Sequence, residues 1–192
     1  IDALNVFPVP DGDTGTNMCS TLQGAWSLLE KTGGRHAGTV AKAASLGALQ
    51  GSSGCSGLIL SNFFIGFSES VASKDVIYAS DFAGALLNGA NLSKDRTFQP
   101  KDETLVAFSL RCSEAAAKQA SDQKGLGSLI DNIYAEANKP LAVSVQPADS
   151  SSSDLLDAGV RGFAYFIEGI WRYSHGQTLS SPRGARLSSS GW

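Results

Sequence analysis

The stretch Asn5-Val-Phe-Pro-Val-Pro-Asp-Gly-Asp-Thr-Gly-Thr-Asn17 decides how the rest of the chain is interpreted. Its two prolines fix their own φ angles and bias the residues before them toward extended backbone. Asp11 and Asp13 follow, and a glycine two residues further on permits a sharp turn. Thr16 or Asn17 can then cap a helix. The stretch therefore predicts a stiff, extended approach that brings two carboxylates to the start of a helix.

The helix expected after this stretch has one apolar face. Its apolar residues recur with helical spacing and are Met18, Leu22, Ala25, Trp26 and Leu29. A helix N-terminus carries free N–H groups and a positive dipole end, which suit a phosphate group. Two adjacent carboxylates repel phosphate unless a cation lies between, and magnesium is commonly held by one or two carboxylates together with substrate phosphates. The residues indicate a magnesium-bound nucleotide or other polyphosphate; an ordinary Asp-Gly turn before a capped helix is the alternative.

Three common motifs for metals or nucleotides are excluded. An EF-hand starting at Asp11 needs Gly at its sixth and Glu at its twelfth position, which are Thr16 and Leu22 here. A P-loop needs the tripeptide Gly-Lys-Ser/Thr, which does not occur in the chain. A Rossmann glycine loop must follow a strand. Residues 39–50, which precede the glycine-rich segment at 51–57, lack strand-like alternation.

Composition indicates one globular domain. The 192 residues are enough for a sizeable core, and 42% of them are apolar. The net charge of −3, with no long basic run, gives no electrostatic footprint for nucleic acid. The three cysteines (Cys19, Cys55 and Cys112) are widely spaced without a C-x-x-C pair, which argues against a disulfide framework or zinc site and favours a reducing cytoplasm.

Nothing in the sequence is typical of a membrane protein. No apolar run approaches the length of a membrane span, and no signal peptide is present. Because the chain begins with Ile, we expect further residues upstream. The composition changes to Ser, Gly, Arg and Pro after Tyr173, so we expect a domain at 1–174 and a tail or linker at 175–192. His36 and His175 are expected to be solvent-exposed.

Almost every periodic segment predicts a helix. These segments begin at about residues 17, 39, 58, 80, 104, 126 and 157, and Pro140 is expected to kink or end the sixth. The alanine-rich second segment favours close helix packing. The sequence therefore predicts an all-α bundle of about seven helices, a fold in which cofactor sites form where facing helices converge.

A glycine- and serine-rich loop, Gly51-Ser-Ser-Gly-Cys-Ser-Gly57, lies between the second and third predicted helices. Its glycines let backbone N–H groups approach a phosphate, and Ser56 can cap the helix or donate a hydrogen bond. The alternative is a flexible linker, which is unusual between two apolar helices of a compact domain.

Three motifs resemble the nucleotide-binding domain of bacterial fatty acid kinase. They are residues 5–18, residues 54–61 (Gly-Cys-Ser-Gly-Leu-Ile-Leu-Ser) and residues 157–162 (Asp-Ala-Gly-Val-Arg-Gly), in the family's order and spanning nearly the whole chain. The chain is similar, more distantly, to the ATP-binding subunit of dihydroxyacetone kinase. The resemblance implies an antiparallel helical barrel of seven to eight helices that holds ATP and two magnesium ions at one end. It also implies transfer of the γ-phosphoryl group to a fatty acid presented by a lipid-binding partner, giving an acyl phosphate, with further domains downstream.

The resemblance also assigns roles to residues. Asp11 and Asp13 are implied as the catalytic carboxylates, and the implied metal ligands are Asn5, Asp11 and Asp13. The implied nucleotide-binding residues are Thr14, Gly15, Thr16, Asn17, Cys55, Ser56, Thr104, Asp157 and Gly159. Cys55 stands where fatty acid kinases usually have Asn, and the glycine usual before Thr104 is missing. Thr104 and Asp157 can instead be ordinary helix caps.

Two other functions stay open at this stage. One is an ATP-binding subunit of the dihydroxyacetone kinase type, although the Pro-Val-Pro entry and Thr14 favour the fatty-acid branch, because the other branch usually has His at that position. The second is a non-catalytic module that senses nucleotide or docks partners. Whether the domain forms a homodimer is also open.

Overall fold

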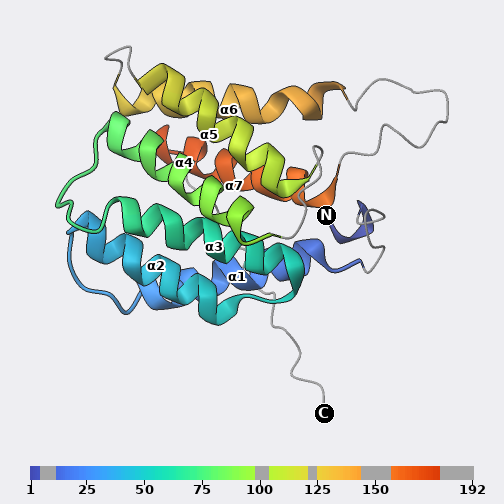
Figure 1. Ribbon diagram of the computed structural model, residues 1–192, viewed down its shortest axis with the longest axis horizontal. Helices are drawn as coiled ribbons and strands as arrows, with labels where there is room; N and C mark the ends of the chain where they lie inside the picture. The colour runs from blue at the N-terminus through green and yellow to red at the C-terminus, as the bar shows by residue number, and fades with distance from the viewer. Residues whose placement is uncertain (5–11, 98–103, 121–124, 144–156, 178–192) are drawn as a thin grey trace.

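The computed structural model describes residues 1–4, 12–97, 104–120, 125–143 and 157–177 (Figure 1). These residues form a short 3-10 helix, η1 (Asp2–Leu4), and seven α-helices. The α-helices are α1 (Thr14–Leu29), α2 (Ala37–Gly51), α3 (Gly54–Ser70), α4 (Ala79–Asp95), α5 (Leu105–Gln119), α6 (Leu126–Val143) and α7 (Ala158–Ser174). No strand occurs in the part of the chain just given. The predicted all-α fold is confirmed.

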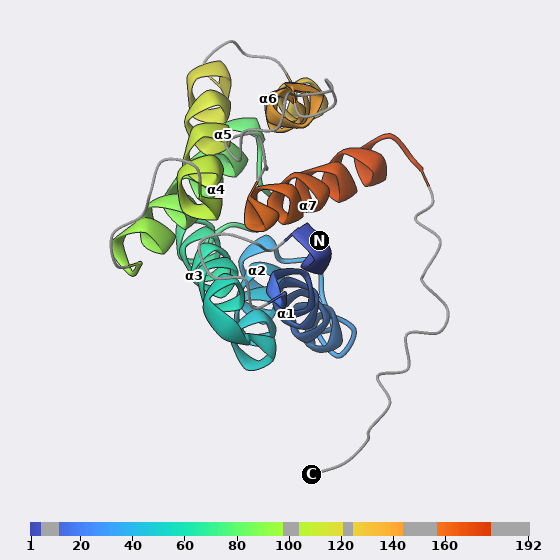
Figure 2. The ribbon, with the colours of Figure 1, turned by 90° about the vertical axis from the view of Figure 1, so that its right-hand side faces the viewer.

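The seven helices alternate in direction and close into a ring. Each helix packs against the next one in the sequence, and α7 packs back against α1 (Figure 2). Because the directions alternate, α1, α3, α5 and α7 all begin at the same end, on the right-hand side of Figure 1. We call this end the N-terminal end of the barrel. The predicted antiparallel barrel therefore brings together residues that are far apart in the sequence.

Aromatic and aliphatic side chains from every helix except α2 fill the inside of the barrel. The large members of this core are Met18, Leu60, Phe63, Leu86, Phe108, Ile133, Phe163 and Ile167. Phe63 and Phe163 meet edge to face with ring centroids 5.3 Å apart, and Phe108 contacts Phe163 in the same way. Burying a side chain of this size contributes about 1.5–3 kcal/mol. These contacts tie α3, α5 and α7 together behind the N-terminal end.

The helices α1 and α2 approach each other closely through glycines. A β-carbon at Gly24 would lie 2.3 Å from the carbonyl oxygen of Gly47, and a β-carbon at Gly47 would lie equally close to that of Gly24. One turn nearer the N-terminal end, the Ser20 hydroxyl donates to the Gly51 carbonyl over 2.9 Å. The predicted close packing of the second helix is confirmed, and it holds the start of α1 in place.

Several local predictions were wrong. The N-cap of α1 is Asp13, so the helix begins before Thr16 and Asn17, which lie inside it. Trp26 is 62% exposed, because α1 turns Gly24 and Ala25 toward its neighbours instead. Pro140 does not end α6, which continues to Val143, and a kink at Pro140 stays a prediction.

Both histidines serve as helix caps. His36 is the N-cap of α2, where its Nδ1 atom accepts a hydrogen bond from the Thr39 N–H over 3.2 Å. His175 follows the last residue of α7 and lies against the Trp171 ring, with centroids 4.4 Å apart. His175 is exposed as expected, whereas His36 is partly buried. The predicted boundary between residues 174 and 175 stays a prediction.

Candidate functional site

The starts of α1 and α3 meet at the N-terminal end of the barrel. The Ser56 hydroxyl donates to the carbonyl oxygen of Thr14 over 3.4 Å. Gly54 has a positive φ of 59°, and a β-carbon there would lie 2.2 Å from Nδ2 of Asn17. Glycine tolerates both demands because it has no side chain. Two motifs about forty residues apart in the sequence are thus in direct contact.

A second contact one turn further along fixes the angle between α1 and α3. The Thr21 hydroxyl donates to the carbonyl oxygen of Asn17 over 2.9 Å, and a β-carbon at Gly57 would lie 2.8 Å from the Thr21 hydroxyl oxygen. Asn17, Thr21 and Ser56 are buried, whereas Cys55 is exposed. The first turn of α3 is therefore held against α1 while the Cys55 side chain faces away from the core.

The third motif starts α7 at the same end. Asp157 is the N-cap of α7 and accepts a hydrogen bond from the Val160 N–H over 3.0 Å. Burial raises the pKa of the Asp157 carboxyl above its ordinary value, against the opposing effect of the Val160 and Gly159 N–H groups. A β-carbon at Gly159 would lie 2.9 Å from Cβ of Leu105, so α7 begins directly against the start of α5, whose N-cap is Thr104.

The start of α7 also packs against α1. A β-carbon at Gly162 would lie 2.5 Å from the Met18 sulfur. The Nε atom of Arg161 is buried and, among the described residues, makes no hydrogen bond. Arg161 was not singled out from the sequence, where a basic residue in a helix carries no special signal. Its cation and the positive ends of four helices meet at one end, and this arrangement suits an anion such as a polyphosphate.

The N-terminus of α1 is capped by a residue from outside the helix. The Asp2 carboxylate accepts hydrogen bonds from the Thr16 N–H over 3.0 Å and from the Thr16 hydroxyl over 2.6 Å. The hydrogen bond from the Thr16 hydroxyl holds the pKa of Asp2 below its ordinary value. Asp13, the N-cap itself, makes no capping bond with its side chain. Sequence reasoning missed Asp2, because no spacing rule connects residues fourteen apart across a loop.

The predicted site residues fall into two groups. Asn5 and Asp11 lie outside the described residues. The structure brings Asp13, Thr14, Gly15, Thr16, Asn17, Cys55, Ser56, Thr104, Asp157 and Gly159 to the N-terminal end of the barrel. The backbone N–H groups of Thr16 and Asn17 already have partners, the Asp2 carboxylate and the Asp13 carbonyl oxygen. Nucleotide contact by these residues stays a prediction.

A metal site is only partly represented in the described residues. Within them, no group of three or more His, Cys, Asp or Glu side chains lies close enough to hold a metal ion. The Asp13 carboxylate, which is not used for capping, is the kind of hard oxygen ligand that magnesium prefers. The residues present thus fit a magnesium-bound phosphate at the level of their chemistry, and the predicted ligand set stays a prediction.

Comparison with known proteins identifies the class. Residues 8–172 match the DAK2 domain, and the chain belongs to this family. DAK2 domains are nucleotide-binding modules of the dihydroxyacetone kinase type and work with partner domains or subunits. This agrees with the four helix N-termini that converge at one end of the barrel.

Individual relatives extend well beyond this chain. Protein YloV of Bacillus subtilis is 33% identical over 180 residues, which cover 93% of this chain and 32% of YloV. Protein SSP1546 of Staphylococcus saprophyticus is 32% identical over 186 residues, covering 94% of this chain and 33% of the relative. Protein SH1689 of Staphylococcus haemolyticus is 30% identical over 184 residues, 95% of this chain and 33% of the relative. The chain spans about a third of the length of the curated relatives it matches.

Among the described helices, none is long and apolar enough to cross a membrane.

Proposed function

We propose that this domain binds magnesium-bound ATP at the N-terminal end of the barrel and supplies it to a fatty acid kinase reaction. The observation that carries the proposal is the contact between Asn17 and Gly54, which joins the starts of α1 and α3 beside an Asp13 carboxylate that makes no capping bond. A polyphosphate needs N–H donors on one side and a metal-holding carboxylate on the other, and these two elements offer both.

The phosphate groups are proposed to bind to the first turn of α3. Gly54, Cys55 and Ser56 present their backbone at the start of this helix, and Gly54 allows the close approach that a side chain would block. The positive end of the α3 dipole points toward the same place. Because the contact is made by the backbone, the Cys at position 55 is compatible with it.

Asp13, together with Asp11 and Asn5 from outside the described residues, is proposed to hold two magnesium ions. When bound, magnesium spreads the negative charge that develops on the transferred phosphoryl group. Asp157 and Gly159 at the start of α7 and Thr104 at the start of α5 are proposed to line the nucleotide on the other side. The proposed acceptor is the carboxylate of a fatty acid presented by a lipid-binding partner protein, and the product is an acyl phosphate.

A dihydroxyacetone-kinase-type subunit is the second candidate function. The family is shared with such kinases, so the nucleotide site is common to both proposals. The Pro-Val-Pro entry and Thr14 favour the fatty-acid acceptor. A non-catalytic nucleotide-binding module is the third candidate, and the Cys at position 55 is the feature that favours it.

Acceptor and nucleotide can be tested in two stages. Isothermal titration of ATP with and without magnesium tests the site, and we expect micromolar binding that needs magnesium. The acceptor is tested with a chain extended to the length of its relatives and supplied with a fatty-acid-loaded partner. Acyl phosphate formed in this assay is trapped with hydroxylamine and measured as the hydroxamate. Phosphorylation of dihydroxyacetone in the same assay would favour the second candidate. Tight ATP binding without transfer to either acceptor would favour the third.

A further inference from the structure

The first turns of α1 and α7 start in the same way in sequence but are capped differently. Each has Asp as its N-cap residue, Asp13 in α1 and Asp157 in α7. In α7, the Asp157 carboxylate accepts the N–H of the third helical residue, Val160, as an N-cap normally does. In α1, the third helical residue is Thr16, and its N–H is bonded to Asp2 instead. Asp2 thus occupies the place that Asp13 would take.

The backbone conformations of Asp157 and Asp13 agree with this exchange of caps, in which Asp2 replaces Asp13 as the cap of α1. Asp157 has φ −50° and ψ 133°, and such an extended ψ lets the side chain of an N-cap fold back over the first turn. Asp13 has φ −123° and ψ −1°, which is not an extended conformation, and its side chain makes no capping bond. The α1 helix is nevertheless capped, because both oxygens of the Asp2 carboxylate bond to Thr16.

The position of Asp2 is fixed by packing as well as by hydrogen bonds. A β-carbon at Gly15 would lie 2.7 Å from Oδ1 of Asp2 and 2.8 Å from Cβ of Ile1. Only glycine at position 15 therefore lets η1 lie against the start of α1. Ile1 also reaches toward α7, where a β-carbon at Gly162 would lie 3.6 Å from its Cδ1 atom. Residues 1–2, which include Asp2, are thus packed between the starts of α1 and α7.

We propose that Asp2 is a positioning residue that takes over the capping of α1 and so leaves the Asp13 carboxylate available to magnesium. The proposal rests on the proposed function for its ligand, but the exchange of caps is a property of the protein alone. Without Asp2, the Thr16 N–H would be left for the Asp13 carboxylate, which would then turn away from the metal.

The first experiment is a stability cycle that needs no nucleotide. Thermal unfolding is measured for Asp2→Ala, Asp13→Ala and the double variant in the 192-residue chain. Because Asp13 makes no capping bond in the wild type, Asp13→Ala alone should leave Tm unchanged. Asp2→Ala should lower Tm only in part, because Asp13 replaces it as the cap, and the double variant should lose more than the two single variants together. Additive losses would overturn the exchange of caps.

The second experiment measures the magnesium concentration that gives half-maximal ATP binding. Asp2→Ala should raise this concentration about tenfold, the usual effect of losing a residue that positions a metal ligand. Asp2→Asn, whose amide oxygen can still accept the Thr16 N–H, should restore most of the affinity. The matched control is His36→Ala, which removes the equivalent cap on the Thr39 N–H of α2 at the other end of the barrel. The control should lower Tm but leave the magnesium dependence unchanged.

The outcomes separate this proposal from the proposed function. If Asp2→Ala lowers Tm like His36→Ala and leaves the magnesium dependence unchanged, Asp2 is only structural and the proposal is wrong. If Asp2→Asn is as impaired as Asp2→Ala, the Asp2 charge itself matters and positioning is contradicted. If the wild type does not bind ATP with magnesium, the proposed function fails, and the stability cycle still decides whether the caps are exchanged.

Discussion

The side chain of Asn17 lies so close to Gly54 that a β-carbon at position 54 would stand 2.2 Å from its Nδ2 atom. This contact joins the N-termini of two helices that begin forty residues apart. The contact requires glycine at position 54 for two reasons: a side chain would have no space there, and the residue has a positive φ of 59°.

Gly54→Ala should therefore weaken both the fold and the site. The left-handed backbone alone costs a non-glycine residue about 1–2 kcal/mol. Displacing Asn17 should add to this cost and lower ATP affinity by about tenfold, or ~1.4 kcal/mol. Denaturant unfolding and isothermal titration would measure the two effects.

Gly176→Ala is the matched control for Gly54→Ala. Gly176 also has a positive φ, 67°, but no atom lies within 4 Å of a β-carbon placed there. We expect it to destabilise the chain by the backbone cost alone and to leave ATP affinity unchanged. Equal effects of the two substitutions on ATP affinity would show that the contact with Asn17 is irrelevant to the site.

A second pair of glycines tests the packing of the barrel. Gly24→Ala places a β-carbon 2.3 Å from the Gly47 carbonyl oxygen, so α1 and α2 must separate. We expect a loss of about 1–3 kcal/mol in the free energy of unfolding. Gly84→Ala, in α4 with open space around it, should instead stabilise the chain by up to about 1 kcal/mol, because alanine favours helix. Loss of stability in Gly84→Ala, or none in Gly24→Ala, would contradict the packing described here.

The pH dependence of stability should carry the signature of Asp157. Because burial raises the pKa of its carboxyl in the folded chain, the charged form is the one that folding disfavours. Its unfavourable contribution is absent below the unfolded pKa of about 3.8 and reaches its full size once pH rises above the folded pKa.

Asp157→Asn keeps a good N-cap while removing this charge. In the absence of nucleotide and metal, the variant should be more stable than the wild type at pH 7. The difference should shrink as pH falls through the folded pKa and vanish below about 3.8. Urea unfolding across this pH range would measure it. If the stability of the variant relative to the wild type were instead lower at pH 7 than at acidic pH, the sign of the pH dependence would be reversed. That result would contradict the raised pKa of Asp157.

Much of the fold could be predicted from local patterns. Apolar spacing indicated seven helices, and the small, mainly alanine residues of the second helix indicated close packing. Trp26 could not be placed, because the spacing of apolar residues does not tell which side of α1 faces α2; the contact between Gly24 and Gly47 decides it.

The places of the candidate site residues in the fold were predicted in outline, and one detail was missed. The resemblance of the three motifs to one family implied that residues near 13, 55 and 157 share a site. In the structure, each of them stands at the start of a helix that begins at the N-terminal end of the barrel. The capping of α1 by Asp2 depends on how η1 lies between α1 and α7, and no rule for local spacing contains that information. The same holds for the buried Nε atom of Arg161.

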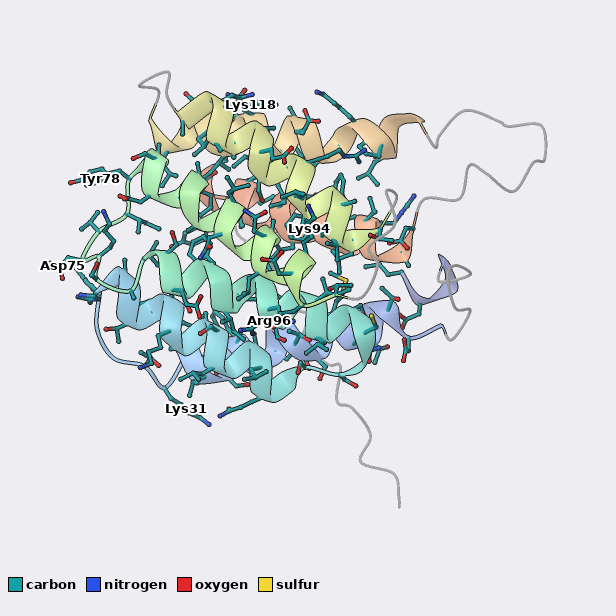
Figure 3. All side chains as sticks on the ribbon, viewed as in Figure 1. Lys31, Asp75, Tyr78, Lys94, Arg96 and Lys118 are labelled. Atoms are coloured by element: carbon teal, nitrogen blue, oxygen red, sulfur yellow. The ribbon has the colours of Figure 1, made fainter. Side chains whose placement is uncertain are left out.

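The most direct test of the account is isothermal titration of magnesium and ATP into the wild type, Asp13→Asn and Asp75→Asn. Asp75 is an exposed aspartate that pairs with His36 at the opposite end of the barrel, so its substitution makes the same chemical change far from the site (Figure 3). We predict micromolar, magnesium-dependent binding in the wild type and in Asp75→Asn, and its loss in Asp13→Asn. Unchanged binding in Asp13→Asn, or binding that does not need magnesium, would contradict the central claim that Asp13 holds the metal of a bound nucleotide.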